Sequence, residues 1–136
     1  MPKYSINRRF GNLGEKLACQ FLMKRHHKIL QQNYLKPWGE IDVISLEDGK
    51  YHFIEVKSVS GEIPIDVNHE TSAFGDNFRP EENVHPQKLK RLHRTIESYL
   101  MENNIQNEWQ LDVITVKIDK GTKRAEIEII ENIVGE

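Results

Sequence analysis

Asp42, Glu55 and Lys57 are the residues of this chain whose types and spacing could do chemistry. Strand alternation puts Glu55 and Lys57 on one side of a strand, two residues apart. The pair Asp48-Gly49 predicts a tight hairpin turn, and a turn centred there places Asp42 directly opposite Glu55. Two carboxylates in that position repel each other unless a cation lies between them. Because the ligands would be oxygens, with no cysteine nearby, we expect Mg²⁺ or Mn²⁺.

The chemistry that such a site supports is hydrolysis of a phosphodiester bond. A carboxylate-bound Mg²⁺ lowers the pKa of its water and polarises the phosphate. Lys57 beside that ion could donate to the attacking oxygen or stabilise the charge that develops at phosphorus. The alternative is a surface cluster of cross-strand ion pairs, with an effect on stability of ~0–1 kcal/mol. The spacing of the three residues leaves both interpretations open.

The elements that must position these residues follow from the spacing of the apolar side chains. In chain order we predict a helix at 12–25, strands at 28–35, 40–46 and 51–58, a helix at 87–103, and strands at 111–118 and 125–130. Asn12 is the expected N-cap of the first helix. This order indicates an α/β fold with a mixed sheet flanked by helices.

Between the third strand and the second helix lies a long segment, 59–86, without apolar periodicity. A loop of this length is usually functional or disordered, so we predict a mobile insertion within a single domain of 136 residues. The segment holds six acidic residues and one basic residue, whereas the whole chain has a net charge of only −2. The remainder of the chain is therefore slightly basic, and a phosphate-rich partner is compatible with it.

Two further residues are predicted to flank the carboxylates. Glu15 lies at the edge of the apolar arc of the first helix, where Gly11, Gly14 and Ala18 would allow close packing. Lys88 lies on the flank of the apolar stripe of the second helix, whereas Lys90 points away from it. An acid-free basic run surrounds it, made of Lys88, Lys90, Arg91 and Arg94. This run could bind phosphate or could be a solvated helix surface.

The histidines give a weaker signal. His26 and His27 are neighbours near a helix end, so their side chains diverge, and we expect surface residues rather than a metal site. His52 lies on the opposite strand face from Glu55 and cannot join that cluster. Asp112 begins a predicted strand and is expected to pair only locally.

Bulk features bear on the compartment. No apolar run approaches the roughly 20 residues needed to cross a bilayer. The N-terminal residues lack the apolar core of a signal peptide. The single cysteine, Cys19, excludes an internal disulfide framework, so we expect a cytoplasmic protein.

The order of motifs resembles the PD-(D/E)xK nuclease superfamily and, more narrowly, the YraN-like family of uncharacterised endonucleases. The resemblance rests on Gly14-Glu15, Gly39-Glu40-Ile41-Asp42 and Phe53-Ile54-Glu55-Val56-Lys57, and extends through Lys88 to Leu111-Asp112-Val113. It implies a restriction-endonuclease-like three-layer fold, related in layout to Holliday-junction resolvases. It also implies a DNA substrate and, more narrowly, branched or junction DNA. By analogy with the resolvases, it implies a homodimer.

Carried over position by position, the resemblance gives Asp42 and Glu55 the role of holding one or two Mg²⁺ or Mn²⁺ ions. Lys57 would assist the attacking water, and Glu15 would approach the metal from the first helix. Lys88 matches a position that faces substrate, and Arg91 is one helical turn further along the same helix.

The chain departs from the family pattern at Val59, where many relatives carry an arginine two positions after the lysine. The acidic segment 59–86 is also longer than usual. Both features bear on substrate choice. A second hypothesis is therefore a nucleic-acid-binding module of the same fold with little or no catalysis. A third is a protein-interaction domain whose acidic segment docks a partner.

Overall fold

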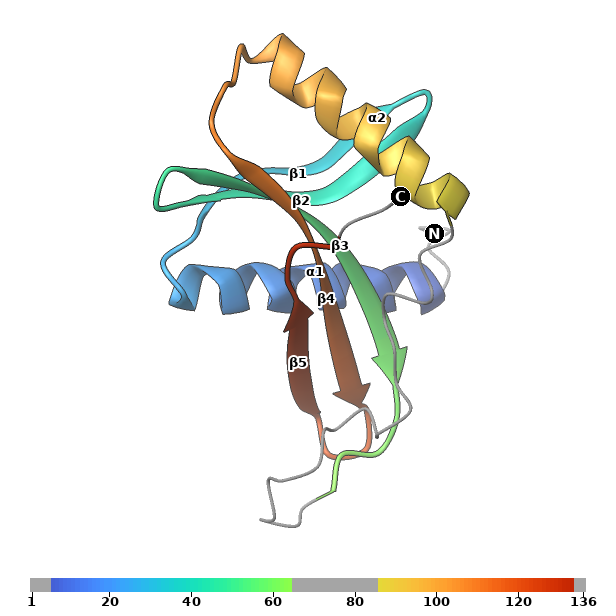
Figure 1. Cartoon of the computed structure of the whole chain (residues 1–136). Coiled ribbons are helices and arrows are strands. Elements are labelled where there is room, and N and C mark those ends of the chain that lie inside the picture. The colour runs from blue at the N-terminus through green and yellow to red at the C-terminus, as the bar shows by residue number, and fades with distance from the viewer. Residues whose placement is uncertain (1–5, 65–85, 134–136) are drawn as a thin grey trace.

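The computed structural model describes residues 6–64 and 86–133, and within them the elements follow the predicted order (Figure 1). The elements are α1 (Ile6–Lys24), β1 (Lys28–Lys36), β2 (Gly39–Glu47), β3 (Lys50–Ser60), α2 (Pro86–Glu102), β4 (Trp109–Asp119) and β5 (Arg124–Ile130). No helix in these ranges is long and apolar enough to cross a membrane.

The five strands form one mixed sheet in the order β1-β2-β3-β4-β5. Neighbouring strands are antiparallel except β3 and β4, which are parallel. The β2–β3 hairpin turns at Asp48 and Gly49, whose φ angles of 53° and 76° are those of a tight hairpin turn with two left-handed residues. The pairs run from Glu47–Lys50 to Val43–Ile54, which confirms the predicted register.

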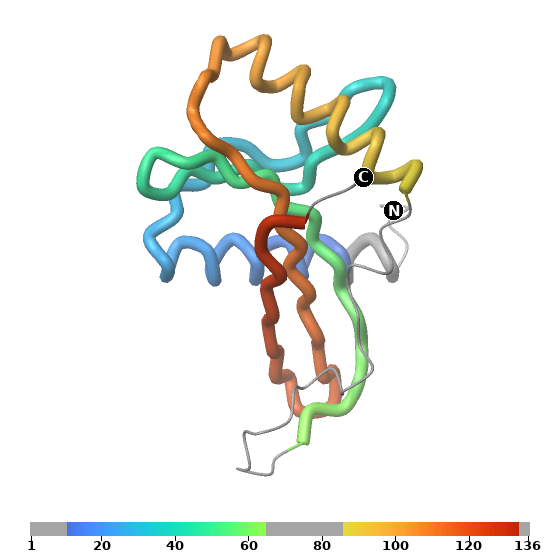
Figure 2. The backbone as a smooth tube through the Cα atoms, in the orientation of Figure 1, coloured from blue at the N-terminus to red at the C-terminus, as the bar shows by residue number. Residues whose placement is uncertain are grey.

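The two helices cover opposite faces of the sheet and give it a core on each side (Figure 2). Under α2 the core consists of Tyr34, Ile41, Ile44, Phe53, Leu92, Ile96, Tyr99, Leu111 and Val113. Under α1 it consists of Ala18, Cys19, Leu22, Val43, Ile54, Ile114, Val116 and Ile118. The protein therefore has the predicted α/β fold, with three layers in the restriction-endonuclease-like arrangement.

Most boundaries lie within two residues of the predicted ones, and the start of α1 and the end of β3 are the two differences that change a predicted feature. Asn12 is not an N-cap, because α1 begins at Ile6 and Asn12 is an exposed residue inside the helix. Glycines inside a helix cost only about 1 kcal/mol each, so Gly11 does not stop it. Strand β3 also extends beyond Ser58, because Val59 and Ser60 pair with β4. Most of the predicted loop, 65–85, lies outside the described residues.

The close approach of α1 to the sheet depends on Gly14. A Cβ atom built on Gly14 would overlap Ser58 Oγ and lie 3.1 Å from Ser58 Cβ, so rotation of the hydroxyl would relieve only part of the clash. We expect Gly14→Ala to lower the free energy of unfolding by about 1–3 kcal/mol. Gly11→Ala is the matched control, since its Cβ would meet no atom within 4 Å and should stabilise the helix by up to about 1 kcal/mol. Urea unfolding of both variants measures the difference. Equal free energies of unfolding would mean that Ser58 does not limit the space beside Gly14.

Candidate functional site

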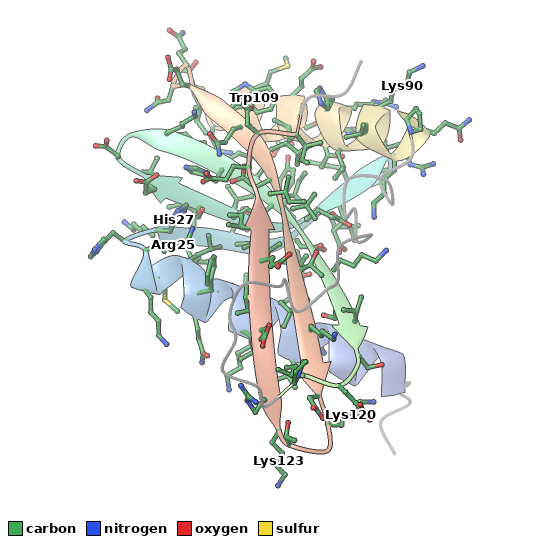
Figure 3. The ribbon with its side chains drawn as sticks, turned by 60° about the horizontal axis from the view of Figure 1, so that its bottom comes forward. Arg25, His27, Lys90, Trp109, Lys120 and Lys123 are labelled. Carbon is green, nitrogen blue, oxygen red and sulfur yellow. The ribbon has the colours of Figure 1, made fainter. Side chains whose placement is uncertain are left out.

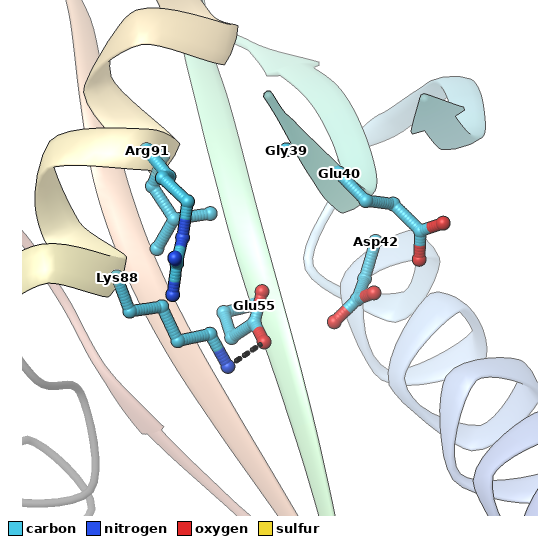
Figure 4. Close-up of a pocket in the computed structure, with 7 residues that line it drawn as sticks. Gly39, Glu40, Asp42, Glu55, Lys88 and Arg91 are labelled. Atoms are coloured by element: carbon cyan, nitrogen blue, oxygen red, sulfur yellow. Dashed lines mark ion pairs between the residues drawn. The ribbon is translucent and has the colours of Figure 1, made fainter. Parts of the chain in front are cut away.

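A pocket of about 430 Å³ opens between α2 and the β2–β3 hairpin (Figure 4). It is lined by Gly39, Glu40, Asp42, Glu55, Lys88, Arg91 and Leu92. Four of the residues predicted from the sequence, Asp42, Glu55, Lys88 and Arg91, are therefore brought together. Strands β2 and β3 supply the acidic side of the pocket and the first two turns of α2 supply the basic side.

Asp42 lies where the ladder between β2 and β3 ends. The last recorded pair is Val43–Ile54, and the same register continued by one step would set Asp42 opposite Glu55. Asp42 Oδ2 instead accepts a hydrogen bond of 2.8 Å from the backbone N–H of Val56. The alternation of β2 also breaks here, since Ile41 and Ile44 both pack under α2 while Val43 packs under α1. The carboxylate of Asp42 thus lies at the point where β2 and β3 are no longer paired.

Burial and neighbouring charge make ionisation of Asp42 unfavourable. Burial is the larger cause and the Glu55 carboxylate the second, and together they raise the pKa of Asp42 to about 8 despite the hydrogen bond from Val56. Glu15 and Glu40 add smaller contributions in the same direction. A carboxyl group held in this way favours a proton or a cation beside it.

Glu15 of α1 approaches the same carboxylates from the other helix. Burial raises its pKa, and the charges of Glu40 and Glu55 raise it further. Its Oε1 atom is buried and has no hydrogen-bond partner among the described residues. A buried carboxylate oxygen without a donor is unfavourable, and a metal ion would satisfy it. Asp42 and Glu55, with Glu15 nearby on α1, therefore offer oxygen ligands of the kind that a hard divalent cation prefers.

The basic side of the pocket is tied to the acidic side by one ion pair. Lys88 Nζ lies 2.7 Å from Glu55 Oε1, and Arg91 extends toward the same carboxylate (Figure 4). The other basic residues of α2 differ in position. Lys90 projects outward from the helix (Figure 3), and the Arg94 guanidinium stacks 4.3 Å from the centre of the Trp38 ring. As predicted, Lys88 therefore lies on the pocket side of α2, whereas Lys90 points away from it.

Lys57 is not among the residues that line the pocket. It is half-buried in β3 opposite Thr115 of β4, and has no ion-pair partner within 6–64 and 86–133. Alternation along the strand puts it on the side of Glu55. Its catalytic role stays a prediction. Glu40, in contrast, lines the pocket and was not predicted, although its position two residues before Asp42 on the same strand was the available signal.

The prediction for the histidine pair is wrong for one member. His26 is exposed and has a φ of 70°, but His27 is buried beside the sheet where α1 ends (Figure 3). Asp112 is also buried inside β4 and bonds to His52 rather than pairing only locally. His52 does lie on the opposite face from Glu55, as predicted, since it contacts His27 beyond the end of α1.

Together, the fold and the site define a three-layer α/β protein with a carboxylate-lined pocket beside a basic helix. The chain belongs to the uncharacterised protein family UPF0102, whose family model matches residues 14–116. This confirms the YraN-like resemblance, while the wider nuclease superfamily stays a prediction.

Relatives in several bacteria match nearly the whole chain. A UPF0102 protein of Helicobacter hepaticus is 35% identical over 127 residues, which are 93% of this chain and 96% of the relative. One of Aliarcobacter butzleri is 36% identical over 124 residues, or 90% and 94% of the two chains. One of Helicobacter pylori is 33% identical over 123 residues, or 90% and 89%. The family name of these relatives assigns no activity.

Proposed function

We propose that this protein is a Mg²⁺- or Mn²⁺-dependent endonuclease that hydrolyses phosphodiester bonds in DNA. The observation that carries the proposal is that Asp42 and Glu55, from two strands, meet in a pocket rimmed by Lys88 and Arg91, with Glu15 of α1 near enough to raise the pKa of Asp42. Branched or junction DNA is the substrate class suggested by the resolvase-like layout, and a cytoplasmic homodimer is the form in which we expect the protein to act.

The metal ion would be held by Asp42 and Glu55, with Glu15 completing the set from α1. When bound, it supplies an activated water and neutralises charge on the scissile phosphate. The unpartnered Oε1 of Glu15, and the burial and carboxylate repulsion that raise the pKa of Asp42, both support such a ligand set. Neither feature is expected of an acidic cluster that only faces solvent, because exposed carboxylates satisfy their oxygens with water.

The remaining side chains would position the nucleic acid and stabilise charge. Lys88 and Arg91 present cations at the mouth of the pocket, where a DNA phosphate would meet them. Lys57 would stabilise the negative charge that develops at phosphorus. Gly39 allows α2 to approach, since a Cβ there would overlap Thr95 Oγ1 and lie 3.2 Å from the Arg91 carbonyl oxygen. The Gly-Glu-Ile-Asp motif thus supplies both a metal ligand and the contact that holds the basic helix beside it.

The experiment that tests the proposal is cleavage of linear duplex, single-stranded and four-way-junction DNA with Mg²⁺, Mn²⁺ or EDTA. Wild-type protein should cut at least one substrate in a metal-dependent way, and Asp42→Ala should not. Asp48→Asn is the matched control, because it removes an exposed carboxylate at the far end of the hairpin and Asn tolerates the positive φ at this position. Absence of metal-dependent cleavage on every substrate would count against the enzyme.

A second candidate is a DNA-binding module with weak or no catalysis. The observation that favours it is the position of Lys57, which is not among the residues that line the pocket. In such a protein the acidic pocket and the basic rim would still bind a cation and DNA, but Lys57 would not stabilise the charge that develops at phosphorus. The two candidates differ in whether any metal-dependent cleavage is measured.

Both candidates make the same prediction for Lys88. Replacing Lys88 with Ala should weaken DNA binding and lower the dependence of log K on log[salt] by about 1, because one phosphate contact is lost. Lys90→Ala is the control on the same helix, since Lys90 points away from the pocket. Fluorescence anisotropy at several salt concentrations measures both slopes. Identical slopes for Lys88→Ala and wild type would mean that Lys88 does not contact a DNA phosphate.

A further inference from the structure

A second group of ligating side chains lies outside the pocket, where α1 ends beside the β2–β3 turn. It consists of His27 after α1, Glu47 at the end of β2 and His52 in β3. One potential ligand atom from each residue lies within 4.8 Å of the other two. The two imidazole rings meet edge to face, with centroids 4.6 Å apart. None of these residues has a role in the proposed nuclease.

Hydrogen bonds fix the orientation of both rings. His52 Nδ1 lies 2.8 Å from Asp112 Oδ2, and Asp112 is fully buried. The other oxygen of Asp112 accepts bonds from Gln110 Nε2 at 2.7 Å and from the backbone N–H of Asn132 at 2.9 Å. His27 Nδ1 lies 2.8 Å from Ser45 Oγ. A carboxylate bonded to the far nitrogen of an imidazole is the arrangement that orients histidine ligands in metal sites.

The geometry leaves His52 Nε2 without a partner. Because Asp112 accepts from Nδ1–H, the neutral ring presents a lone pair at Nε2. This nitrogen is buried, since His52 is only 3% exposed, and it has no hydrogen-bond partner among the described residues. Its nearest charged neighbour is Glu47 Oε1 at 3.4 Å. A lone pair facing a carboxylate oxygen is repulsive, and a cation between them would remove the repulsion.

The separation of these two atoms also fits a specific kind of ion. Two ligands on a tetrahedral zinc ion, with bonds of about 2.0–2.1 Å, lie roughly 3.3 Å from each other. Two imidazoles and one carboxylate are ligands that suit zinc and its neighbours rather than Mg²⁺. The side chain of Glu47 is 41% exposed, so the cluster is open to solvent on that side and an ion can enter.

We propose that His27, Glu47 and His52 bind a zinc-type dication, with Asp112 and Ser45 orienting the two imidazoles. The ion would join the end of α1 to the closed end of the β2–β3 hairpin. The same hairpin carries Asp42 and Glu55 toward its open end. The role of the ion would thus be structural, fixing the hairpin that presents the acidic pocket.

The test is calorimetric titration of Zn²⁺ into tag-free protein previously stripped with EDTA. With excess Mg²⁺ present to occupy the acidic pocket, one equivalent of Zn²⁺ should bind to wild type, and His27→Gln should weaken the affinity by more than about 100-fold. His26→Gln is the matched control, because its exposed neighbouring side chain is not a ligand, and it should leave the affinity unchanged. Glu47→Gln, at a half-exposed side chain, should lower the affinity by at least about tenfold. Circular dichroism verifies that each variant folds.

Two further readouts separate this site from the acidic pocket. In excess Mg²⁺, which occupies the acidic pocket, Zn²⁺ should raise the melting temperature of wild type and of Asp42→Asn equally, but not that of His27→Gln. Co²⁺ in place of Zn²⁺ should give the visible absorption of a tetrahedral site in the same proteins. The proposal is overturned if no variant differs from wild type in Zn²⁺ affinity, or if Asp42→Asn rather than His27→Gln removes the binding. It would stand even if no DNA were cleaved.

Discussion

In metal-free buffer, the free energy of unfolding of wild-type protein is expected to fall by several kcal/mol between about pH 4 and pH 8, and Asp42→Asn should remove most of that fall. The reason is the raised pKa of Asp42, about 8 in the folded protein against an ordinary value of 3.8. Each unit of difference corresponds to about 1.4 kcal/mol. The sign follows from which state binds the proton more tightly.

Below about pH 4 the carboxyl group is protonated in both the folded and the unfolded chain, and its contribution to stability is fully present. As the pH rises, the unfolded chain loses this proton first, so the folded state becomes relatively less stable. The loss continues until the folded group also ionises, near pH 8. An Asn side chain carries no charge at any of these pH values and should therefore give a flatter profile.

Urea unfolding at several pH values, with EDTA present, measures the two profiles. Asp48→Asn is the control, because Asp48 is exposed in the hairpin turn and Asn tolerates its positive φ of 53° equally well. Mg²⁺ added at about pH 8 should restore stability to wild type but not to Asp42→Asn. Parallel profiles for wild type and Asp42→Asn would mean that burial and the neighbouring carboxylates do not raise the pKa of Asp42.

Replacing Lys57 with Ala is expected to reduce metal-dependent cleavage by at least about 100-fold while DNA binding is retained. This is the loss expected when one group that stabilises transition-state charge is removed. Binding should persist because the cations at the rim of the pocket, Lys88 and Arg91, are unchanged. Cleavage rates under single-turnover conditions and anisotropy with the same DNA measure the two effects separately.

The control for Lys57 is Lys50→Ala, which changes the other lysine of β3 at the far end of the strand. It should leave both cleavage and binding close to wild type. A Lys57→Ala protein that cuts DNA as fast as wild type would remove this residue from the mechanism. Metal-dependent cleavage that is absent even from wild type would instead favour the binding module.

Much of this fold could be predicted from local patterns in the sequence. Apolar periodicity located every described helix and strand to within a few residues, except for the start of α1. The Asp48-Gly49 turn fixed the hairpin register, since both residues adopt the positive φ angles that this turn requires. Gly14 was correctly expected to permit close packing, although its partner, Ser58, could be identified only from the structure.

The candidate site could be predicted in part, because its members lie on elements whose faces the sequence defines. What the sequence could not provide was the break in alternation at Asp42, which depends on how β2 twists between two cores. The burial of His27 was missed for a related reason. A histidine after a helix end is usually exposed, and only the meeting of α1 with Ser45 and His52 buries this one. Contacts of this kind are set by tertiary packing and leave no local signal.

The most direct test of the central claim, that the acidic pocket binds a divalent cation, is a calorimetric titration with Mn²⁺ near neutral pH. It is best done in a His27→Gln background, so that only binding at the pocket lined by Asp42 and Glu55 is measured. Adding Asp42→Asn to that background should weaken the binding of one Mn²⁺ equivalent by at least about tenfold. Equal affinity and stoichiometry with and without Asp42→Asn would contradict the claim.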